Sequence, residues 1–278
     1  MSKVHSSDGT AIAYEKSGEG PAVILVDGAL CSRAMGPMPK VASELAERFT
    51  VFTYDRRGRG ESGDTAQYAV EREIEDVEAL IEAAGGSVSL FGASSGAALA
   101  IEVASRSPRV EKLALYEAPF MVDDSREPTP GDYIDRLEAA LAADRPGDAV
   151  KLFMRLVGAP RIMVALMQVT PMWRKLKAAA HTLPYDARIV KDNQRGEPLT
   201  AERWTSATMP TVVFAGGKSP AWMQDAQRAL AAALPNAELR VLPGQTHMVK
   251  AKVTAPELVD FLGRASRREP SGEAAIAT

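Results

Sequence analysis

A serine at position 94 lies where an apolar run ends and an alanine-rich helical pattern begins. The residues around it are Gly92-Ala93-Ser94-Ser95-Gly96, with glycines two positions before and two positions after the serine. Glycines there let the backbone make a tight strand-to-helix turn without a Cβ clash, which lifts the hydroxyl clear of a sheet. The pattern therefore predicts that Ser94 is a nucleophile. The alternative is a turn whose serine only caps a helix.

A nucleophilic serine needs a base, and the chain offers three histidines. An imidazole must take the hydroxyl proton, and a carboxylate must orient that imidazole. His247 follows the last predicted strand in a loop that contains glycine, so it could reach the turn at Ser94. His5 lies in a polar N-terminal stretch. His181 lies in the helical region, where it would be either a solvated surface residue or a residue in contact with substrate. We therefore predict that His247 is the base.

Short apolar runs rich in β-branched residues alternate with longer segments of helical period. This alternation is typical of a mostly parallel sheet with helices on its faces. The predicted strands lie near residues 11–14 and at residues 22–26, 50–54, 87–91, 110–116, 210–215 and 237–242. The spacing breaks once, because about ninety residues separate the last two of these strands from the rest, far more than one crossover needs.

An inserted helical lid, residues 120–209, is the predicted cause of this break. Its segments of helical period are separated by prolines and lie at residues 132–143, 147–157 and 161–180. Most of its apolar side chains are expected to hold the lid together, although methionine is adaptable enough to face a substrate. Met163, Met167 and Trp173 are therefore candidates for the substrate pocket.

The remaining residues divide into a core and a tail. Residues 1–119 and 210–266 are predicted to form the core. Residues 267–278 lack apolar periodicity, which predicts a disordered tail.

Composition excludes several classes of partner. The 278 residues carry a formal net charge of −3, which gives no electrostatic reason to expect nucleic acid or an anionic membrane as a partner. No window approaches the roughly twenty apolar residues of a membrane span. The only cysteine is Cys31, so no intrachain disulfide can form, and the N-terminus does not resemble a secretory signal. We expect a cytoplasmic monomer or homodimer that acts on a small molecule.

Several motifs, in order, resemble those of the α/β-hydrolase superfamily, and the resemblance runs from about residue 9 to about residue 263. Besides the turn at Ser94, residues 26–29 (Val-Asp-Gly-Ala) resemble the oxyanion loop, residues 54–62 the turn after the fourth strand, and residues 243–248 the loop that carries the histidine. The resemblance implies an α/β-hydrolase fold: a mostly parallel eight-stranded sheet, flanked by helices, with an inserted helical lid. It implies no metal and no organic cofactor.

The third member of the triad departs from the commoner pattern of the family. Ser219 occupies the position after the seventh strand where the acid usually stands. The family has a variant in which the acid follows the sixth strand, and Glu117 lies at that strand end. The resemblance therefore favours Glu117, which could instead form a structural ion pair. Asp225, in a helical pattern, and the neighbouring pair at positions 123 and 124 (both Asp) remain alternatives.

By the same resemblance, the backbone N–H groups of Ala29 and Ser95 form the oxyanion hole. Asp27 replaces the histidine often seen before Gly28, so its side chain either shapes this loop or contacts substrate. Asp27 and the nearby Leu30 complete the predicted substrate pocket.

Together these residues predict a serine hydrolase that cleaves a small or medium apolar ester, thioester or lactone through an acyl-enzyme. The same residues would also serve perhydrolysis. Two alternatives remain: a lyase or C–C bond hydrolase that uses the serine and histidine for proton transfer, and a ligand-binding protein that only retains the scaffold.

Overall fold

The apolar runs of the sequence pair into one sheet in the computed structural model, which describes residues 2–264. The sheet has eight strands among these residues, in the order β1-β2-β4-β3-β5-β6-β7-β8. β2 pairs antiparallel with β1 and β4, and the strands from β4 to β8 are parallel to their neighbours. The predicted mostly parallel, eight-stranded sheet is therefore confirmed. The strands are β1 (Ser2–His5), β2 (Ala11–Ser17), β3 (Ala22–Val26), β4 (Thr50–Tyr54), β5 (Val88–Ala93), β6 (Val110–Tyr116), β7 (Thr211–Gly216) and β8 (Ala237–Leu242).

One strand, β1, has no counterpart among the runs found in the sequence. Its four residues, Ser-Lys-Val-His, are mostly exposed at the edge of the sheet. An exposed edge strand has little apolar surface to bury, so it carries no strong hydrophobic pattern.

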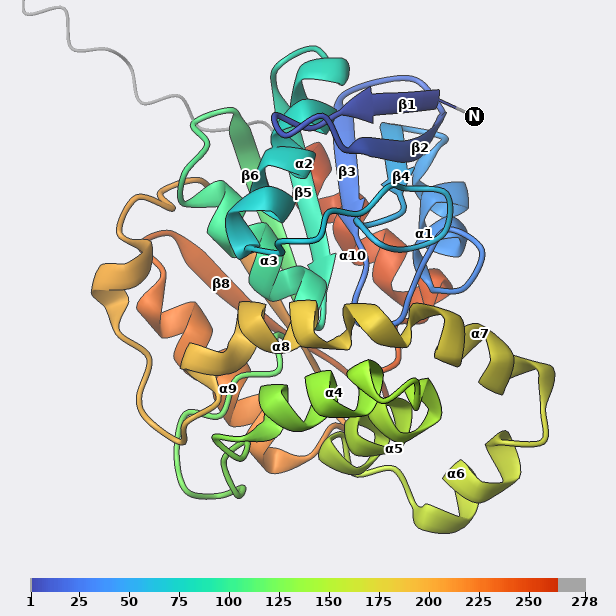
Figure 1. Ribbon diagram of the computed structural model, residues 1–278. Coiled ribbons are helices and arrows are strands. Elements are labelled where there is room, and N and C mark those ends of the chain that lie inside the picture. Colours follow the sequence, from blue (N-terminus) through green and yellow to red (C-terminus); the bar gives the residue numbers. More distant parts are fainter. Residues whose placement is uncertain (1, 265–278) are drawn as a thin grey trace, which may run out of the picture.

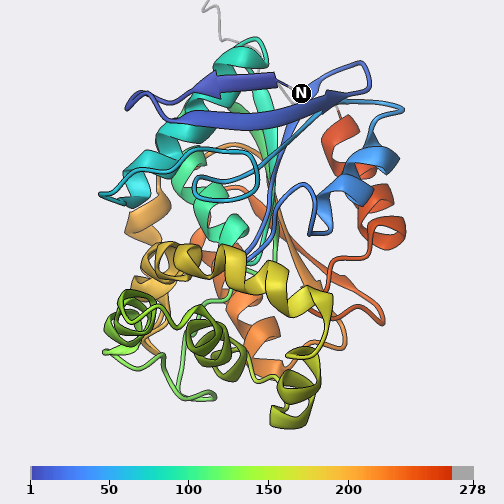
Figure 2. The same ribbon diagram turned by 45° about the vertical axis from the view of Figure 1, so that its right-hand side comes forward.

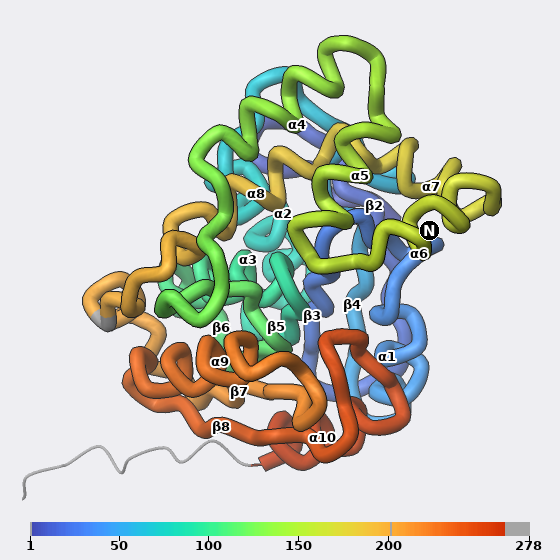
Figure 3. The backbone as a smooth tube through the Cα atoms, turned by 90° about the horizontal axis from the view of Figure 1, so that it is seen from below, coloured from blue at the N-terminus to red at the C-terminus, as the bar shows by residue number. Residues whose placement is uncertain are grey.

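Helices cover both faces of the sheet (Figures 1 and 2). One face packs against α2 (Val70–Ala83), α3 (Ser95–Ala104) and α9 (Ala221–Ala233), and the other against α1 (Met38–Leu45) and α10 (Ala251–Gly263). Side chains on successive strand residues enter opposite cores, as Ile24 and Leu25 of β3 illustrate. Viewed from below, the strands lie side by side in the order given above (Figure 3).

The long insertion between β6 and β7 lies beyond the carboxyl ends of the parallel strands (Figure 1). Its helices are α4 (Tyr133–Ala142), α5 (Pro146–Leu156), α6 (Arg161–Met167), α7 (Pro171–Ala179) and α8 (Leu183–Val190), with short 3-10 turns at Ala180–Thr182, Lys191–Asn193 and Ala201–Trp204. This helical insertion falls within residues 120–209, where the sequence predicts a lid.

The helical pattern predicted over residues 161–180 is interrupted by a proline. Pro171 starts α7, and Thr170 before it has an extended backbone with φ −98° and ψ 157°. A proline disfavours helical geometry in the residue before it and cannot donate to the preceding turn, so α6 and α7 are separate helices.

Two further predictions concern the termini and the membrane. The predicted disordered tail, residues 267–278, lies outside the described residues. Within residues 2–264, no helix has the length and apolar character that crossing a membrane requires.

Candidate active site

Ser94 stands at the junction of β5 and α3 in a strained backbone conformation, with φ 56° and ψ −127°. Left-handed φ values are uncommon in residues other than glycine and concentrate at functional sites. The flanking glycines permit the close packing of this turn. A Cβ on Gly92 would lie 2.4 Å from the Gly96 carbonyl oxygen, and one on Gly96 would lie 2.3 Å from the Val26 carbonyl oxygen.

Three predicted side chains meet at this turn. Ser94 Oγ lies 3.2 Å from His247 Nε2, and His247 Nδ1 lies 2.9 Å from Glu117 Oε2. Glu117 is fully buried after β6, and its other oxygen, Oε1, accepts a hydrogen bond of 2.7 Å from the Gly216 N–H. Each carboxylate oxygen therefore has one donor, which fixes the direction in which the carboxylate faces the imidazole.

Glu117 also has an unusual backbone, since its φ is 45°. The chain turns sharply there and sends the side chain toward β7 and the histidine loop. Propensity alone would not place a glutamate at such a φ.

The alternative acids lie elsewhere. Asp225 is on α9, where it pairs with Arg228 of the same helix. Asp123 is partly exposed and accepts hydrogen bonds from Ser125. Ser219 is buried, and its hydroxyl has no hydrogen-bond partner among the described residues. Glu117 is the acid that contacts His247.

The two other histidines lie outside this cluster. His5 is in the edge strand β1. His181 Nδ1 lies 3.1 Å from the Ala178 carbonyl oxygen, and its Nε2 lies 3.8 Å from an Asp64 carboxylate oxygen on the protein surface.

The loop after β3 passes directly beside the serine. A Cβ on Gly28 would lie 3.1 Å from Ser94 Cβ, so any larger residue there would press against the serine. Within residues 2–264, neither the Ala29 N–H nor the Ser95 N–H has a hydrogen-bond acceptor. One of these donors follows the glycine that contacts Ser94, and the other directly follows Ser94 itself. Backbone donors without an acceptor beside a serine are what an oxyanion hole requires.

Asp27 shapes this loop from inside. Its Oδ1 accepts a hydrogen bond of 3.0 Å from the Gly28 N–H, and a Cβ on Gly36 would come within 2.3 Å of its Oδ2. Burial raises the pKa of Asp27 to about 7, although a hydrogen bond from Gly28 and the charge of Arg59 oppose the rise. Burial, together with the neighbouring Asp27 carboxyl, also raises the pKa of the Cys31 thiol.

Buried ion pairs fasten the insertion to this loop. Asp186 of α8 accepts hydrogen bonds from Arg56 (2.7 Å), Arg59 (2.6 Å) and the Ser95 hydroxyl (2.7 Å). Arg59 also donates to the Gly28 carbonyl oxygen, and Arg56 to that of Asp27. Burial opposes ionisation of Asp186, but the two arginines hold its pKa below the usual value.

Asp186 is a site residue that the sequence analysis missed. The available signal was a single acid in the apolar helical stretch Leu-Pro-Tyr-Asp-Ala-Arg-Ile-Val. A charged residue on the buried side of a helix needs a partner, so such an acid predicts a basic group in the core.

The predicted pocket residues separate into two groups. Leu30 and Trp173 belong to one apolar cluster, and Met167 packs against it. This cluster joins the oxyanion loop to α4, α5, α7 and α8. Met163, in contrast, is 46% exposed and lies outside the cluster. The structure therefore brings Leu30, Met167 and Trp173 together, but not Met163.

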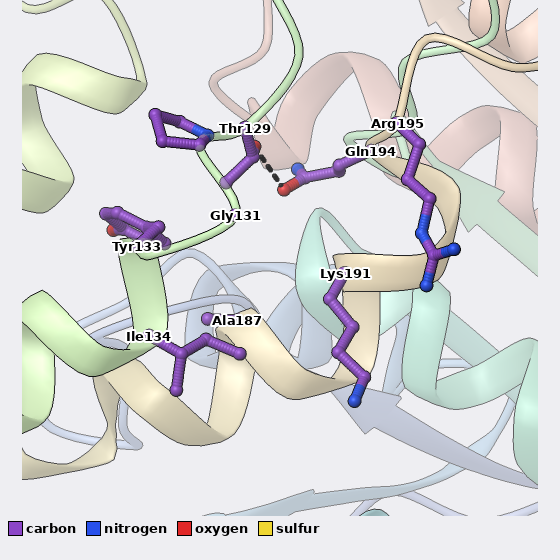
Figure 4. Close-up of a pocket in the computed structure, with 9 residues that line it drawn as sticks. Thr129, Gly131, Tyr133, Ile134, Ala187, Lys191, Gln194 and Arg195 are labelled. Carbon is purple, nitrogen blue, oxygen red and sulfur yellow. Dashed lines mark hydrogen bonds between the residues drawn. The ribbon is translucent and has the colours of Figure 1, made fainter.

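A separate cavity of about 330 Å³ opens between the start of α4 and the end of α8 (Figure 4). Its polar lining includes Thr129, whose hydroxyl donates to Gln194 Oε1, and the cations Lys191 and Arg195. Ser94, His247 and Glu117 do not line this cavity. For metals, residues 2–264 contain no group of three or more His, Cys, Asp or Glu side chains that could hold an ion.

Comparisons with known proteins agree with this fold. The chain is 50% identical to an alpha/beta hydrolase from Sphaerobacter thermophilus over 94% of its own length and all of that chain, with a TM-score of 0.86. An esterase from Exiguobacterium antarcticum shares the fold, with 21% identity, a TM-score of 0.70, and coverage of 95% of this chain and 99% of the esterase.

A curated relative, the uncharacterized hydrolase YraK of Bacillus subtilis, is 31% identical over 118 residues. That match spans 41% of this chain and less than half, 43%, of the relative. Residues 20–251 match the model of the alpha/beta hydrolase family, which is most of the chain. The protein therefore belongs to the alpha/beta hydrolase family, as the motifs around Ser94 predict.

Proposed function

We propose that the protein is a serine hydrolase that cleaves a small or medium apolar ester, thioester or lactone through an acyl-enzyme. The observation that carries the proposal is the continuous chain of contacts from Ser94 Oγ through His247 to the buried Glu117. This arrangement supplies a nucleophile, a base and an orienting carboxylate in one line.

In the first half of the reaction, Ser94 Oγ attacks the carbonyl carbon while His247 Nε2 takes the hydroxyl proton. Glu117 accepts the hydrogen bond from Nδ1–H, which fixes the tautomer with a free Nε2 and stabilises the imidazolium that forms. The Ala29 and Ser95 N–H groups then donate to the oxyanion. Removing one such donor typically costs about 2.7 to 4 kcal/mol of transition-state stabilisation.

In the second half, the imidazolium donates its proton to the leaving oxygen or sulfur, and the acyl group remains on Ser94. His247 then takes a proton from a water molecule whose oxygen attacks the acyl carbon. It returns that proton to Ser94 Oγ as the bond between the acyl carbon and Oγ breaks, and the carboxylic acid leaves. His247 is 39% exposed on its side chain, so water can reach the imidazole.

The preference for an apolar substrate follows from the surroundings of the oxyanion loop. Leu30, directly after Ala29, packs into the cluster that contains Trp173 and Leu183 of the insertion. An acyl chain held beside Ala29 would contact this apolar surface. Pockets lined mainly by apolar side chains with a few placed polar groups are typical of small-molecule sites.

A fluorophosphonate probe tests the nucleophile directly. We expect stoichiometric labelling that maps to Ser94, loss of labelling in Ser94→Ala, and a loss of several orders of magnitude in hydrolysis of a p-nitrophenyl ester. Ser105→Ala, at the far end of α3, is the matched control and should leave both unchanged. Ester hydrolysis that survives in Ser94→Ala would overturn the proposal. Turnover that depends on Ser94 without any trapped acyl-enzyme would instead favour the lyase or C–C hydrolase alternative.

A further inference from the structure

The outermost helix of the insertion, α6, is apolar on every side. Its seven residues are Arg-Ile-Met-Val-Ala-Leu-Met, so Arg161 is the only polar one. Val164 is its only buried residue, while Ile162 is 76% and Leu166 is 66% exposed. A helix that is hydrophobic all round is normally buried. Here most of that apolar surface faces solvent.

The exposed apolar surface continues on both sides of α6. We call it the apolar tip, and it comprises Val157, Ile162, Met163, Leu166, Val169 and Met172. Val169, between α6 and α7, is 87% exposed. Single exposed apolar residues are common in proteins, but here six large ones lie within residues 157–172, and such a concentration is typical of a surface that binds something.

The charged side chains in the sequence around the apolar tip are basic. Residues 149–185 contain six lysines and arginines and no aspartate or glutamate, although Asp148, one position before this range, lies beside Lys151 and Arg155. Five of the six are exposed and have no acidic partner among the described residues: Arg155, Arg161, Arg174, Lys175 and Lys177. The formal charge of the whole chain, −3, conceals this local excess, because acids elsewhere outnumber it.

The position of this region favours a partner with a broad, deformable surface over a partner that binds in a groove. α6 protrudes from the body at the end of the molecule farthest from β1 (Figures 1 and 2). A two-fold contact between copies through the apolar tip would bring two groups of cations, each including Arg161 and Lys175, toward one another, and like charges repel. Apolar side chains rimmed by cations instead match an anionic bilayer surface, where they enter the acyl boundary and the cations meet headgroups.

We propose that the apolar tip docks on an anionic lipid surface. Ile162, Leu166 and Val169 insert between lipid chains, and the surrounding lysines and arginines bind headgroup phosphates. The net charge of the chain gave no reason to expect an anionic membrane as a partner. The proposal differs because only the basic residues around the apolar tip would contact the membrane. Docking requires no chemistry at Ser94, so it stands apart from the proposed function.

Cosedimentation of the full chain with vesicles tests the proposal. With mixed phosphatidylglycerol and phosphatidylcholine vesicles, we expect binding that weakens steeply as salt rises, because salt screens exposed charges over about 10 Å at 0.1 M. Pure phosphatidylcholine vesicles should bind at least about tenfold less. Ser94→Ala should bind like the unmodified chain, which separates docking from catalysis.

Two double variants test the two parts of the surface. I162S/L166S should lower binding at least about tenfold, while Val241→Ser, an exposed valine on β8, should leave it unchanged. R161E/K175E should abolish binding, while the charge-conserving R161K/K175R should retain it. Circular dichroism melting of each variant checks the fold.

Three results would overturn the proposal. One is the absence of binding to anionic vesicles at low salt. Another is binding that survives I162S/L166S in a folded protein. The third is a concentration-dependent dimer, measured by light scattering, that disappears in I162S/L166S and competes with vesicles, because a second copy would then cover the apolar tip.

Discussion

Helices α8 and α6 belong to the same insertion, but they interact with their surroundings in opposite ways. α8 places Asp186 in the core, where two arginines and the Ser95 hydroxyl hold it. α6 buries only Val164 and presents Ile162 and Leu166 to solvent. Buried ion pairs and hydrogen bonds therefore hold the insertion near Ser94, whereas at α6 only one buried side chain holds it to the rest of the protein.

The difference shows how one segment can serve two purposes. Ion pairs and hydrogen bonds have direction, so Asp186 fixes the position of α8 relative to the oxyanion loop and the start of α3. Apolar contact has no direction, so α6 can exchange one apolar environment for another. Substitutions in α8 should therefore alter the position of the oxyanion loop without altering the apolar tip, and substitutions in α6 should do the reverse.

The largest effect should come from breaking the charged attachment of α8. Asp186→Ala leaves Arg59 in the core without an acidic partner among residues 2–264, while Arg56 keeps its pair with Glu73. Losing one partner of a buried pair typically costs about 3–5 kcal/mol of folding free energy. Urea unfolding measures the loss. Asp192→Ala, which removes two surface ion pairs, with Arg195 and Arg203, just after α8, is the matched control and should cost less than about 1 kcal/mol. Equal losses would show that Asp186 does not fasten the insertion.

The next effect concerns the acid. Glu117→Gln can still accept a hydrogen bond, but it does not stabilise the imidazolium, so turnover should fall at least about a hundredfold, or about 2.7 kcal/mol, with little change in KM. Asp225→Asn on α9 is the parallel variant and should change turnover far less. If Asp225→Asn proved the more damaging of the two, the role assigned to Glu117 would be wrong.

A smaller effect should appear in the pH dependence of stability. Burial raises the pKa of Asp27 in the folded chain to about 7, whereas in the unfolded chain the carboxyl releases its proton near its ordinary pKa of 3.8. The folded state therefore binds more protons between these values, and stability falls as pH rises through this range. Asp27→Asn lacks this loss, so its stability relative to the unmodified chain should improve by about 2 kcal/mol between about pH 5 and about pH 8.

Urea titrations of both proteins at these two pH values measure the difference. Asp76, whose pKa burial raises to about 6, titrates in both proteins and cancels in the comparison. The charges facing Asp27, those of Arg56 and Arg59, remain constant over this range, and the Cys31 thiol titrates above it. An unchanged difference between the two pH values would show that Asp27 is ionised in the folded protein.

The sequence was sufficient for features that depend on neighbouring residues. The sheet follows from local apolar runs, and the turn at Ser94 from five consecutive residues; both the strand that precedes it and the helix that follows were predicted. Glu117 depended on family resemblance, because nothing local links it to His247, 130 positions away. These expectations describe the placement of the residues, while their catalytic roles remain part of the proposal.

Features that depend on distant contacts or on surfaces were not predicted. Asp186 meets Arg56 and Arg59 across 130 and 127 positions, and no periodicity encodes such a pairing. Net charge averages over the chain, so it could not reveal a basic region around α6. Met163 was expected to face a pocket because methionine is adaptable. Its side chain is 46% exposed and lies outside the cluster that contains Leu30, and its role in a pocket stays a prediction.

The smallest effect should distinguish the two sides of α6 itself. Leu166 is larger than Val164, yet Leu166 faces solvent and Val164 packs into the apolar cluster of the insertion. Leu166→Ala should therefore change the free energy of unfolding by no more than about 0.5 kcal/mol, as most surface substitutions do. Val164→Ala removes two buried methyl groups and should cost more than about 1 kcal/mol. If Leu166→Ala cost more than Val164→Ala, the leucine would be covered in solution, by the body of the protein or by a second copy. Binding to anionic vesicles should show the opposite order. Leu166→Ala should weaken binding more than Val164→Ala does, because Leu166 is the side chain that lipid would cover.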